Sequence, residues 1–297
     1  MPDSFRLDSA GQVEITYVEE LLLPTSVRWM LEGVERAAAE ACAGWMQPHY
    51  QNADGYLLQS IHTLVVRTPG RVMLVDTGVG NGKDRAGGIP AFNQLDTDFL
   101  ARLAEAGVDP IEVDTVLCTH MHTDHVGWNT HLQDGKWVPT FPNARHLFVQ
   151  SEWMHWHEVA RDAEATARLL EDSITPVFEA GLVDLVPADH QVSEHVRLVP
   201  SHGHSPGHVT VEVSAGGRTA ALIGDVMHSP MQAAFPDIKP PLDREQAAPA
   251  AARQALLERY ADTDTLVLGA HWPWPPARLK RDGDAYRVEA VEGLEGA

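Results

Sequence analysis

Short apolar runs, each closed by a turn, recur along most of this chain. Residues 62–78 read HTLVVR, the turn TPG and then RVMLVDTG, a pattern that predicts a β-hairpin of two buried strands. HVTVEV and RTAALIGD, on either side of residues 215–217, predict a second hairpin, and the turn at 281–284 predicts a third. The apolar runs DTVLCT, HLFVQ, VRLVP and TLVLGA predict single strands between them.

Helical spacing appears between these strands. We expect helices over 97–107, over 151–172 with Ser151 as the capping residue, and around 245–260. Residues 12–45 begin as a strand and continue with helical propensity, so their pattern is mixed. No linker, low-complexity run or internal repeat divides the chain. We therefore predict one domain over 1–297, with 1–60 an N-terminal segment whose packing the sequence leaves open.

Composition narrows the class of protein. The chain has 297 residues and 44% hydrophobic residues, enough for a large core. Its net charge of −20 disfavours nucleic-acid and anionic-membrane partners, because both would be repelled. The first twenty residues lack the pattern of a secretion signal, and no apolar stretch reaches the ~18 residues of a membrane span. We expect a cytoplasmic protein that acts on a small molecule.

The chemistry lies in four short segments, each directly after a predicted strand. Two cysteines, Cys42 and Cys118, are too few for a thiolate metal site, so any ligands must be nitrogen and oxygen. THMHTDH, SHGHSPGH, LIGDV and GAHWP supply such ligands. The candidates are His120, His122, Asp124, His125, His204, Asp225 and His271.

The spacing of these residues suits two metal ions. Residues two apart on extended backbone point to the same side, so His120 and His122 can chelate one ion while Asp124 and His125 turn towards a second. We expect His204 to complete the first set and His271 the second. Asp225 can bridge the two ions, and a shared water would fill the vacancy typical of catalytic sites. Imidazole and carboxylate ligands suit zinc, and also manganese or iron.

Four motifs together resemble the signature of the metallo-β-lactamase superfamily. They are T-H-M-H-T-D-H at 119–125, G-H-S-P-G-H at 203–208, G-D at 224–225 and the late His271. The resemblance implies an α+β fold, a four-layer αββα sandwich with metals at one edge of the sheets. Within that superfamily, LVDTG at 74–78, SEW at 151–153 and the C-terminal tail resemble the branch of methyl parathion hydrolase and lactonases.

The resemblance implies a di-metal hydrolase in which a metal-bridging hydroxide attacks a carbonyl or phosphoryl centre. We expect cleavage of a small, moderately apolar ester, a lactone or carboxylic ester, with a phosphotriester as the alternative substrate. Asp124 could orient the nucleophile or pass a proton to the leaving group. A second alternative is an iron-dependent oxidoreductase on the same scaffold. Asp76 and His208 are expected to hold the ligands or their loop rather than bind metal.

Other features have simpler explanations. GVGNGKD at 78–84 departs from the P-loop pattern and is interpreted as a flexible turn. Cys118 is interpreted as a core residue, and His146, His155, His157 and His190 as ordinary histidines.

Aromatic residues near the ligands could line an apolar substrate pocket. Trp153, Trp272 and Phe235 are the candidates we favour, with Trp29, Trp45 and Trp156 as further ones. The first forty residues could cover this pocket or mediate homodimerisation, and the sequence leaves both alternatives open.

Overall fold

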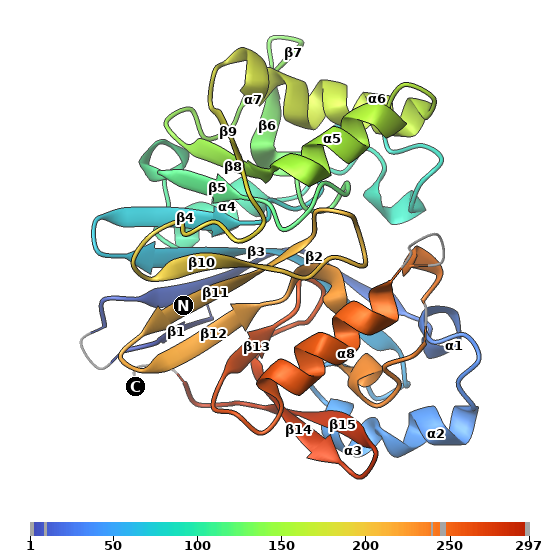
Figure 1. Ribbon diagram of the computed structural model, residues 1–297. Helices are drawn as coiled ribbons and strands as arrows, with labels where there is room; N and C mark the ends of the chain where they lie inside the picture. Colours follow the sequence, from blue (N-terminus) through green and yellow to red (C-terminus); the bar gives the residue numbers. More distant parts are fainter. Residues whose placement is uncertain (1–2, 9–10, 239, 244–247, 295–297) are drawn as a thin grey trace.

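Two large β-sheets form the centre of the computed structural model, which describes residues 3–8, 11–238, 240–243 and 248–294 (Figure 1). The first sheet has seven strands in the order β1-β2-β3-β4-β5-β8-β9. Its strands are β1 (Ser4–Arg6), β2 (Glu14–Thr25), β3 (Leu57–Thr68), β4 (Arg71–Val75), β5 (Thr115–Leu117), β8 (Arg145–Val149) and β9 (Val183–Val186). Residues of the N-terminal segment thus supply two strands of this sheet.

The second sheet follows the chain order from β10 to β15. Its strands are β10 (Val196–Pro200), β11 (Val209–Ala215), β12 (Arg218–Leu222), β13 (Leu266–Leu268), β14 (Ala277–Asp282) and β15 (Ala285–Ala290). A separate hairpin pairs β6 (Thr130–Gln133) with β7 (Lys136–Pro139).

Helices cover the outer face of each sheet (Figure 1). They are α1 (Val27–Met30), α2 (Arg36–Ala41), α3 (Ala43–Met46), α4 (Phe99–Glu105), α5 (Gln150–Val159), α6 (Glu164–Leu169), α7 (Thr175–Glu179) and α8 (Pro249–Tyr260). A π-helical turn, η4 (Leu170–Ile174), joins α6 to α7, and short 3₁₀ turns η5 (Gly224–Val226), η6 (Pro230–Ala233) and η7 (Pro241–Asp243) follow β12.

Three apolar cores separate these layers. One lies between the two sheets and includes Ile15, Val66 and Val211. The second joins the six-stranded sheet to α1, α2, α3 and α8, and the third joins the seven-stranded sheet to α4 and the α5–α7 region. The order helix, sheet, sheet, helix is the four-layer αββα sandwich that the family resemblance implied, because each sheet buries one face against the other sheet and one against helices.

Two parallel strand pairs direct their carboxyl ends to one edge of the sandwich. β4 pairs in parallel with β5 in the first sheet, and β12 with β13 in the second. The segments that follow these strands therefore meet at that edge, as expected where parallel strands end together. Residues 76–80, 118–127, 223–229 and 269–272 lie in these segments.

Most predicted elements are present, and the helix predicted over 151–172 differs. It begins at Gln150, Val149 occupies the N-cap position, and no side-chain hydrogen bond caps it, so the role predicted for Ser151 is wrong. The helix also stops at Val159, and α6 starts only after Ala163 adopts extended backbone. The helix predicted around 245–260 runs over Pro249–Tyr260, and residues 245–247 lie outside the described part.

The loop after β4, which we had interpreted as a flexible turn, is held by buried charges. The Glu20 carboxylate accepts hydrogen bonds from the Val79 and Gly80 amides, at 2.6 and 3.1 Å. Lys83 Nζ donates to Thr130 Oγ1 and to the carbonyl oxygen of Asp172, at 2.8 and 3.0 Å. These hydrogen bonds hold both the start and the middle of the loop in place.

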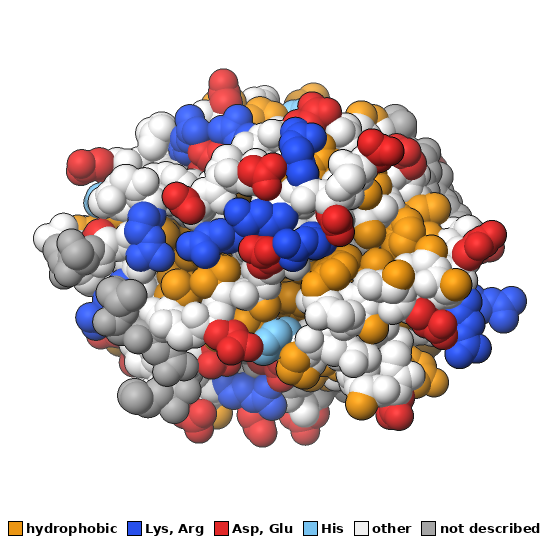
Figure 2. Space-filling model, turned by 90° about the horizontal axis from the view of Figure 1, so that it is seen from below, with side chains coloured by type: hydrophobic (Ala, Val, Ile, Leu, Met, Phe, Trp, Pro, Cys, Tyr) orange, Lys and Arg blue, Asp and Glu red, His pale blue; other side chains and the backbone are white. Residues whose placement is uncertain are grey.

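Surface charge is mixed despite the net charge of −20. Figure 2 shows a band of Lys and Arg side chains across the face seen from below, with Asp and Glu side chains beside it. No helix within the described ranges is both long and apolar enough to cross a lipid bilayer.

Candidate metal centre

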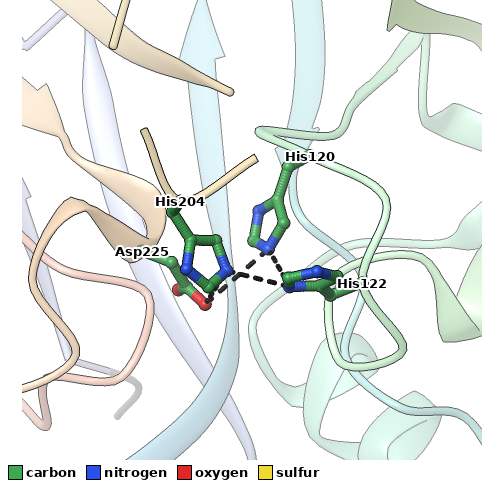
Figure 3. Close-up of side chains that lie close together, drawn as sticks. All are labelled: His120, His122, His204 and Asp225. Atoms are coloured by element: carbon green, nitrogen blue, oxygen red, sulfur yellow. Dashed lines mark hydrogen bonds and ion pairs between the residues drawn. The ribbon is translucent and has the colours of Figure 1, made fainter. Parts of the chain in front are cut away.

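The seven candidate ligands converge at the edge where the parallel strands end. His120, His122, His204 and Asp225 place one ligand atom each within 4.8 Å of one another, and so do Asp124, His125 and His271. Figure 3 shows the first group, in which two histidines come from the loop after β5 and face His204 and Asp225 from the second sheet. The structure therefore brings together the two ligand sets in the division that the spacing predicted.

Nitrogen atoms in the first set face one another across hydrogen-bonding distances. His122 Nδ1 lies 2.9 Å from His120 Nε2 and 2.8 Å from His204 Nε2. Each ring nitrogen can carry at most one proton, and one atom, His122 Nδ1, is shared by both contacts. Three imidazole nitrogens that point at a common centre form the donor set that a divalent ion accepts.

Asp225 lies between the two sets. Its Oδ2 atom is 3.4 Å from His204 Nε2 in the first set and 3.4 Å from His125 Nε2 in the second. Its Oδ1 atom is 3.2 Å from His271 Nε2. One carboxylate thus faces ligands of both sets, which is the position a bridging ligand requires.

The outward ring nitrogens are engaged by the surrounding protein, which fixes how the rings face. His125 Nδ1 meets Asp76 Oδ2 at 2.9 Å and His204 Nδ1 meets Asp243 Oδ1 at 2.7 Å. His120 Nδ1 contacts Thr119 Oγ1, and His271 Nδ1 contacts the Ser60 carbonyl oxygen, both at 3.1 Å. These partners leave Nε2 of four histidines as the atom that faces inward.

Several inward atoms have no protein partner, and this tests whether metal ions fit. Buried His125 Nε2 and Asp225 Oδ1 make no hydrogen bond within the described part of the chain. Unpaired buried polar atoms are costly, so a group that satisfies them is expected. Five imidazoles and two carboxylates with inward lone pairs suit divalent ions such as zinc, manganese or iron(II). The residues present therefore fit a binuclear metal site.

Burial and charge act in opposite directions on the cluster. Burial, helped by neighbouring histidines, holds the pKa of His120 and His122 well below the usual range. Burial alone would also lower the pKa of His125 and His271, but the Asp225 carboxylate and its acidic neighbours outweigh it and raise both values. The Asp225 carboxylate therefore favours positive charge on the imidazoles that surround it.

The predicted supporting residues contact ligands from outside. Asp76 adopts a left-handed backbone with φ of 59°, uncommon for a residue with a side chain, and its carboxylate also accepts hydrogen bonds from Thr119 N and Oγ1. His208 Nδ1 contacts Ser201 Oγ at 2.9 Å, and His208 Nε2 accepts from the Asp225 amide at 3.0 Å. Both His208 nitrogens are thus used within the protein, which leaves neither free for a metal.

Sequence reasoning missed two members of this cluster. His228 is buried, its Nε2 atom lies 3.4 Å from Asp225 Oδ2, and neither ring nitrogen has a hydrogen-bond partner among the described residues. Asp243 joins ligand His204 to the buried Arg253 guanidinium, 3.0 Å away. The position of His228, three residues after Asp225 in GDVMH, was an available signal. Asp243 gave none, because only the fold brings it to His204.

The aromatic residues predicted to line a pocket lie in different surroundings. Trp272 is buried in a core, and its Nε1 donates to the Met227 carbonyl oxygen at 3.0 Å. Phe235 packs against the same core, and Trp153 lies 4.4 Å from the Phe178 ring. Trp156, instead, meets the ring of ligand His122 at 5.0 Å. A pocket role for Trp153, Trp272 and Phe235 stays a prediction.

Comparison with known proteins places this site in a family context. The family model described as the metallo-beta-lactamase superfamily matches residues 58–271. A protein of Mycobacterium tuberculosis named "Probable metallo-hydrolase Rv2300c" is 26% identical over 252 residues, which cover 75% of this chain and 77% of that protein. "Metallo-beta-lactamase domain-containing protein 1" of Xenopus laevis is 26% identical over 192 residues, with 64% and 66% covered.

Solved structures share the fold over nearly the whole chain. A hydrolase of the beta-lactamase superfamily, AbOPH, superimposes with a TM-score of 0.79 at 20% identity and covers 99% of both chains. AidC, a dizinc quorum-quenching lactonase, gives a TM-score of 0.75 at 19% identity and covers 98% of both chains. At these identities the likeness shows the fold, and the match extends to the residues before the family segment.

Proposed function

The chain belongs to the metallo-beta-lactamase superfamily, and from that membership together with the site geometry we propose that it is a di-metal hydrolase of small, moderately apolar esters. Lactones and carboxylic esters are the favoured substrates, and phosphotriesters, as in methyl parathion hydrolase, are the alternative. The observation that carries the proposal is the set of imidazoles that converge around Asp225, in which His125 Nε2 and Asp225 Oδ1 have no hydrogen-bond partner among the described residues.

The proposed ligands fall into two sets. His120, His122 and His204 would hold one ion and Asp124, His125 and His271 the other, with Asp225 shared between them. When bound, two divalent ions supply Lewis acidity and lower the pKa of water so that it becomes a nucleophile near neutral pH. Zinc is the ion we favour, with manganese or iron as alternatives.

The chain's own residues orient and shield the reaction. Asp124 is among the more accessible ligands, with 11% of its side chain exposed, while the side chains of His125 and Asp225 are 1% and 4% exposed. Substrate would therefore approach from the side of Asp124 and His122. From this position the Asp124 carboxylate can orient the nucleophile or move a proton to the leaving group.

His228 is suited to a separate role. Its ring stacks against that of His271, with centroids 5.6 Å apart and planes 6° apart, and neither of its nitrogens makes a hydrogen bond within the described part of the chain. An imidazole beside the reacting centre that has no protein partner can donate a hydrogen bond to an oxygen on which charge develops.

A neighbouring cavity supports a substrate with an apolar part. It has a volume of about 1270 Å³ and is lined mainly by residues 26–56, which include apolar Trp29, Leu31 and Val34 together with charged side chains, and by Pro241. Pro241 begins the turn that ends with Asp243, the partner of ligand His204. We propose that this cavity accepts the apolar substituent of the ester, which gives the N-terminal segment a role in specificity.

The comparisons support the lactone reading by analogy, since AidC is a dizinc lactonase of the same fold. Lactones, aryl esters, phosphotriesters, thioesters and β-lactams should be screened with one preparation, and metal content measured in the same sample. We expect turnover of lactones or aryl esters, and turnover of β-lactams alone would contradict the proposal.

An iron-dependent oxidoreductase is the second candidate on this scaffold, because the same ligands accept iron. The two candidates differ in their need for oxygen. Hydrolysis should proceed unchanged under anaerobic conditions, whereas an oxygen-dependent activity would stop.

A further inference from the structure

Glu152, in the first turn of α5, is a buried carboxylate that accepts four hydrogen bonds. Glu152 is only 1% exposed. The donors are Met121 N at 3.1 Å, Trp156 Nε1 at 2.6 Å, Ser205 Oγ at 2.8 Å and Gly207 N at 2.7 Å. A buried carboxylate is tolerated only when such donors replace water. The four donors that surround Glu152 therefore suit a carboxylate at this position.

The two oxygens of this carboxylate serve different loops. Oε1 accepts from Met121, which lies between His120 and His122, and Oε2 accepts from Ser205, which directly follows His204. The first loop leaves β5 of the seven-stranded sheet, and the second leaves β10 of the six-stranded sheet. One carboxylate therefore connects, across the two sheets, the backbone segments that carry all three histidines of the first ligand set.

The fit on the second loop is close. A Cβ atom on Gly207 would lie 2.5 Å from both the Cβ and the amide nitrogen of Glu152, closer than real Cβ atoms approach. Only glycine lets the loop reach α5 at this point. On the other side, Trp156 donates to Glu152 and also packs against the His122 ring.

The second ligand set shares the loop after β5 through Asp124 and His125, but other groups hold its imidazoles. His125 is held by Asp76 and His271 by the carbonyl oxygen of Ser60. None of the hydrogen bonds described for Glu152 reaches the residues that carry this set. Loss of the Glu152 carboxylate should consequently disturb the two ions unequally.

We propose that Glu152 is a positioning residue that sets the affinity of the first metal ion by fixing the distance between the loops of His120, His122 and His204. This inference rests on the proposed di-metal function. If Glu152 contributed to folding alone, its loss would lower stability without distinguishing between the two ions.

Glu152→Gln is the direct test. A glutamine side chain has one accepting oxygen, and its NH₂ group would face the N–H donors of one loop, so that loop is released. We expect the affinity for one of two Zn²⁺ ions to fall by about tenfold or more, the size seen when a supporting contact of a metal ligand is lost. Gly207→Ala should produce the same selective loss by pushing the second loop away from α5.

Asp172→Asn is the matched control, because it breaks a buried ion pair with Arg85, 2.6 Å away, that contacts no ligand loop. Zn²⁺ affinities should be measured by competition with a chromophoric chelator, and thermal stability recorded for each variant. We expect Asp172→Asn to lose stability and to bind two ions as the wild type does. Excess Zn²⁺ should restore the activity of Glu152→Gln.

Each outcome decides a separate point. Two ions bound by Glu152→Gln with wild-type affinities, or equal weakening of both ions, would overturn the role of Glu152. A wild-type protein that fails to bind two Zn²⁺ ions would instead refute the proposed function on which this inference rests.

Discussion

Two of the clusters of buried charged side chains in this protein balance their charges in different ways. In the first, the Arg85 guanidinium donates to both oxygens of Asp172, at 2.6 and 2.8 Å, and Lys83 Nζ lies 3.9 Å from the Trp137 ring centroid. In the second, Asp225 is surrounded by imidazoles, and its Oδ1 atom makes no hydrogen bond among the described residues.

The difference separates a structural cluster from a candidate metal centre. Lys83 and Arg85 bring positive charge to Asp172 from within the chain, so no outside cation is required. Burial lowers the pKa of Lys83 to about 7, and the Asp172 carboxylate opposes that shift. Around Asp225, by contrast, the partners are imidazoles, and a metal ion from outside the chain would complete the cluster.

Removal of the Asp225 carboxylate, which faces both ligand sets, should have the largest effect on activity. Asp225→Ala deletes the one ligand that faces both sets, and we expect turnover to fall by about 10³-fold or more, since metal ions contribute several kcal/mol to catalysis. Hydrolysis rates and metal content measured on the same folded sample provide the check. His122→Ala should act similarly. Unchanged turnover in either variant would refute the mechanism.

Asp172→Asn tests the structural cluster. It leaves two buried cationic side chains without their counter-charge, and we expect unfolding to become easier by about 3–5 kcal/mol, the usual loss when one partner of a buried pair is removed. Urea denaturation gives the free energy of unfolding. Since none of the contacts described for Asp172 reaches a candidate ligand, kcat should remain near the wild-type value. A large fall in kcat would show that the cluster around Asp172 also contributes to catalysis.

His228→Gln sharpens the division within the metal centre. We expect kcat to fall by about 10²-fold while two ions remain bound, because the imidazole would act on the reacting oxygen and not as a ligand. Steady-state kinetics together with metal analysis separates these roles. Loss of one ion in this variant would identify His228 as a ligand instead.

The smallest expected effect is a change in the pH dependence of stability, and it comes from His146, which lies outside both clusters. Burial lowers the pKa of His146 to about 4, below the ordinary value of 6.5, so the unfolded chain binds more protons between these pH values. The contribution of His146 to stability is therefore complete above pH 6.5 and declines as the pH falls towards 4. We compare the free energy of unfolding of His146→Leu with that of the wild type at each pH. This difference should favour the variant by on the order of 2 kcal/mol more at pH 4 than at pH 8.

Denaturation curves of both proteins at the two pH values measure this difference. The metal-centre histidines titrate in both proteins and cancel from the comparison. An equal offset at both pH values would show that His146 does not bind protons differently in the folded state.

Many of the strands and the seven candidate ligands could be predicted from the sequence because their signals are local, whereas β6, β7 and β9 were not predicted. Each ligand follows an apolar run within a few residues, as His120 follows β5 and His271 follows β13. Glycines and prolines marked the hairpin turns in the same way.

The residues that support the ligands could not be found locally. Glu152 contacts Gly207 across 55 positions of the chain, and Asp243 contacts His204 across 39. The first contact joins segments that follow strands of different sheets, and the second joins segments that follow β10 and β12 of one sheet. The break between α5 and α6 was missed for a related reason, because Ala160 to Ala163 contain neither glycine nor proline to mark it.

The central claim, that two metal ions held by these residues drive hydrolysis, is tested most directly by adding metal back to the stripped protein. Zn²⁺ should be titrated into chelator-treated enzyme while bound metal and the rate of lactone or aryl ester hydrolysis are followed without oxygen. We predict that the full rate is reached only when two equivalents are bound per chain. Full activity in protein that contains no metal would contradict the account.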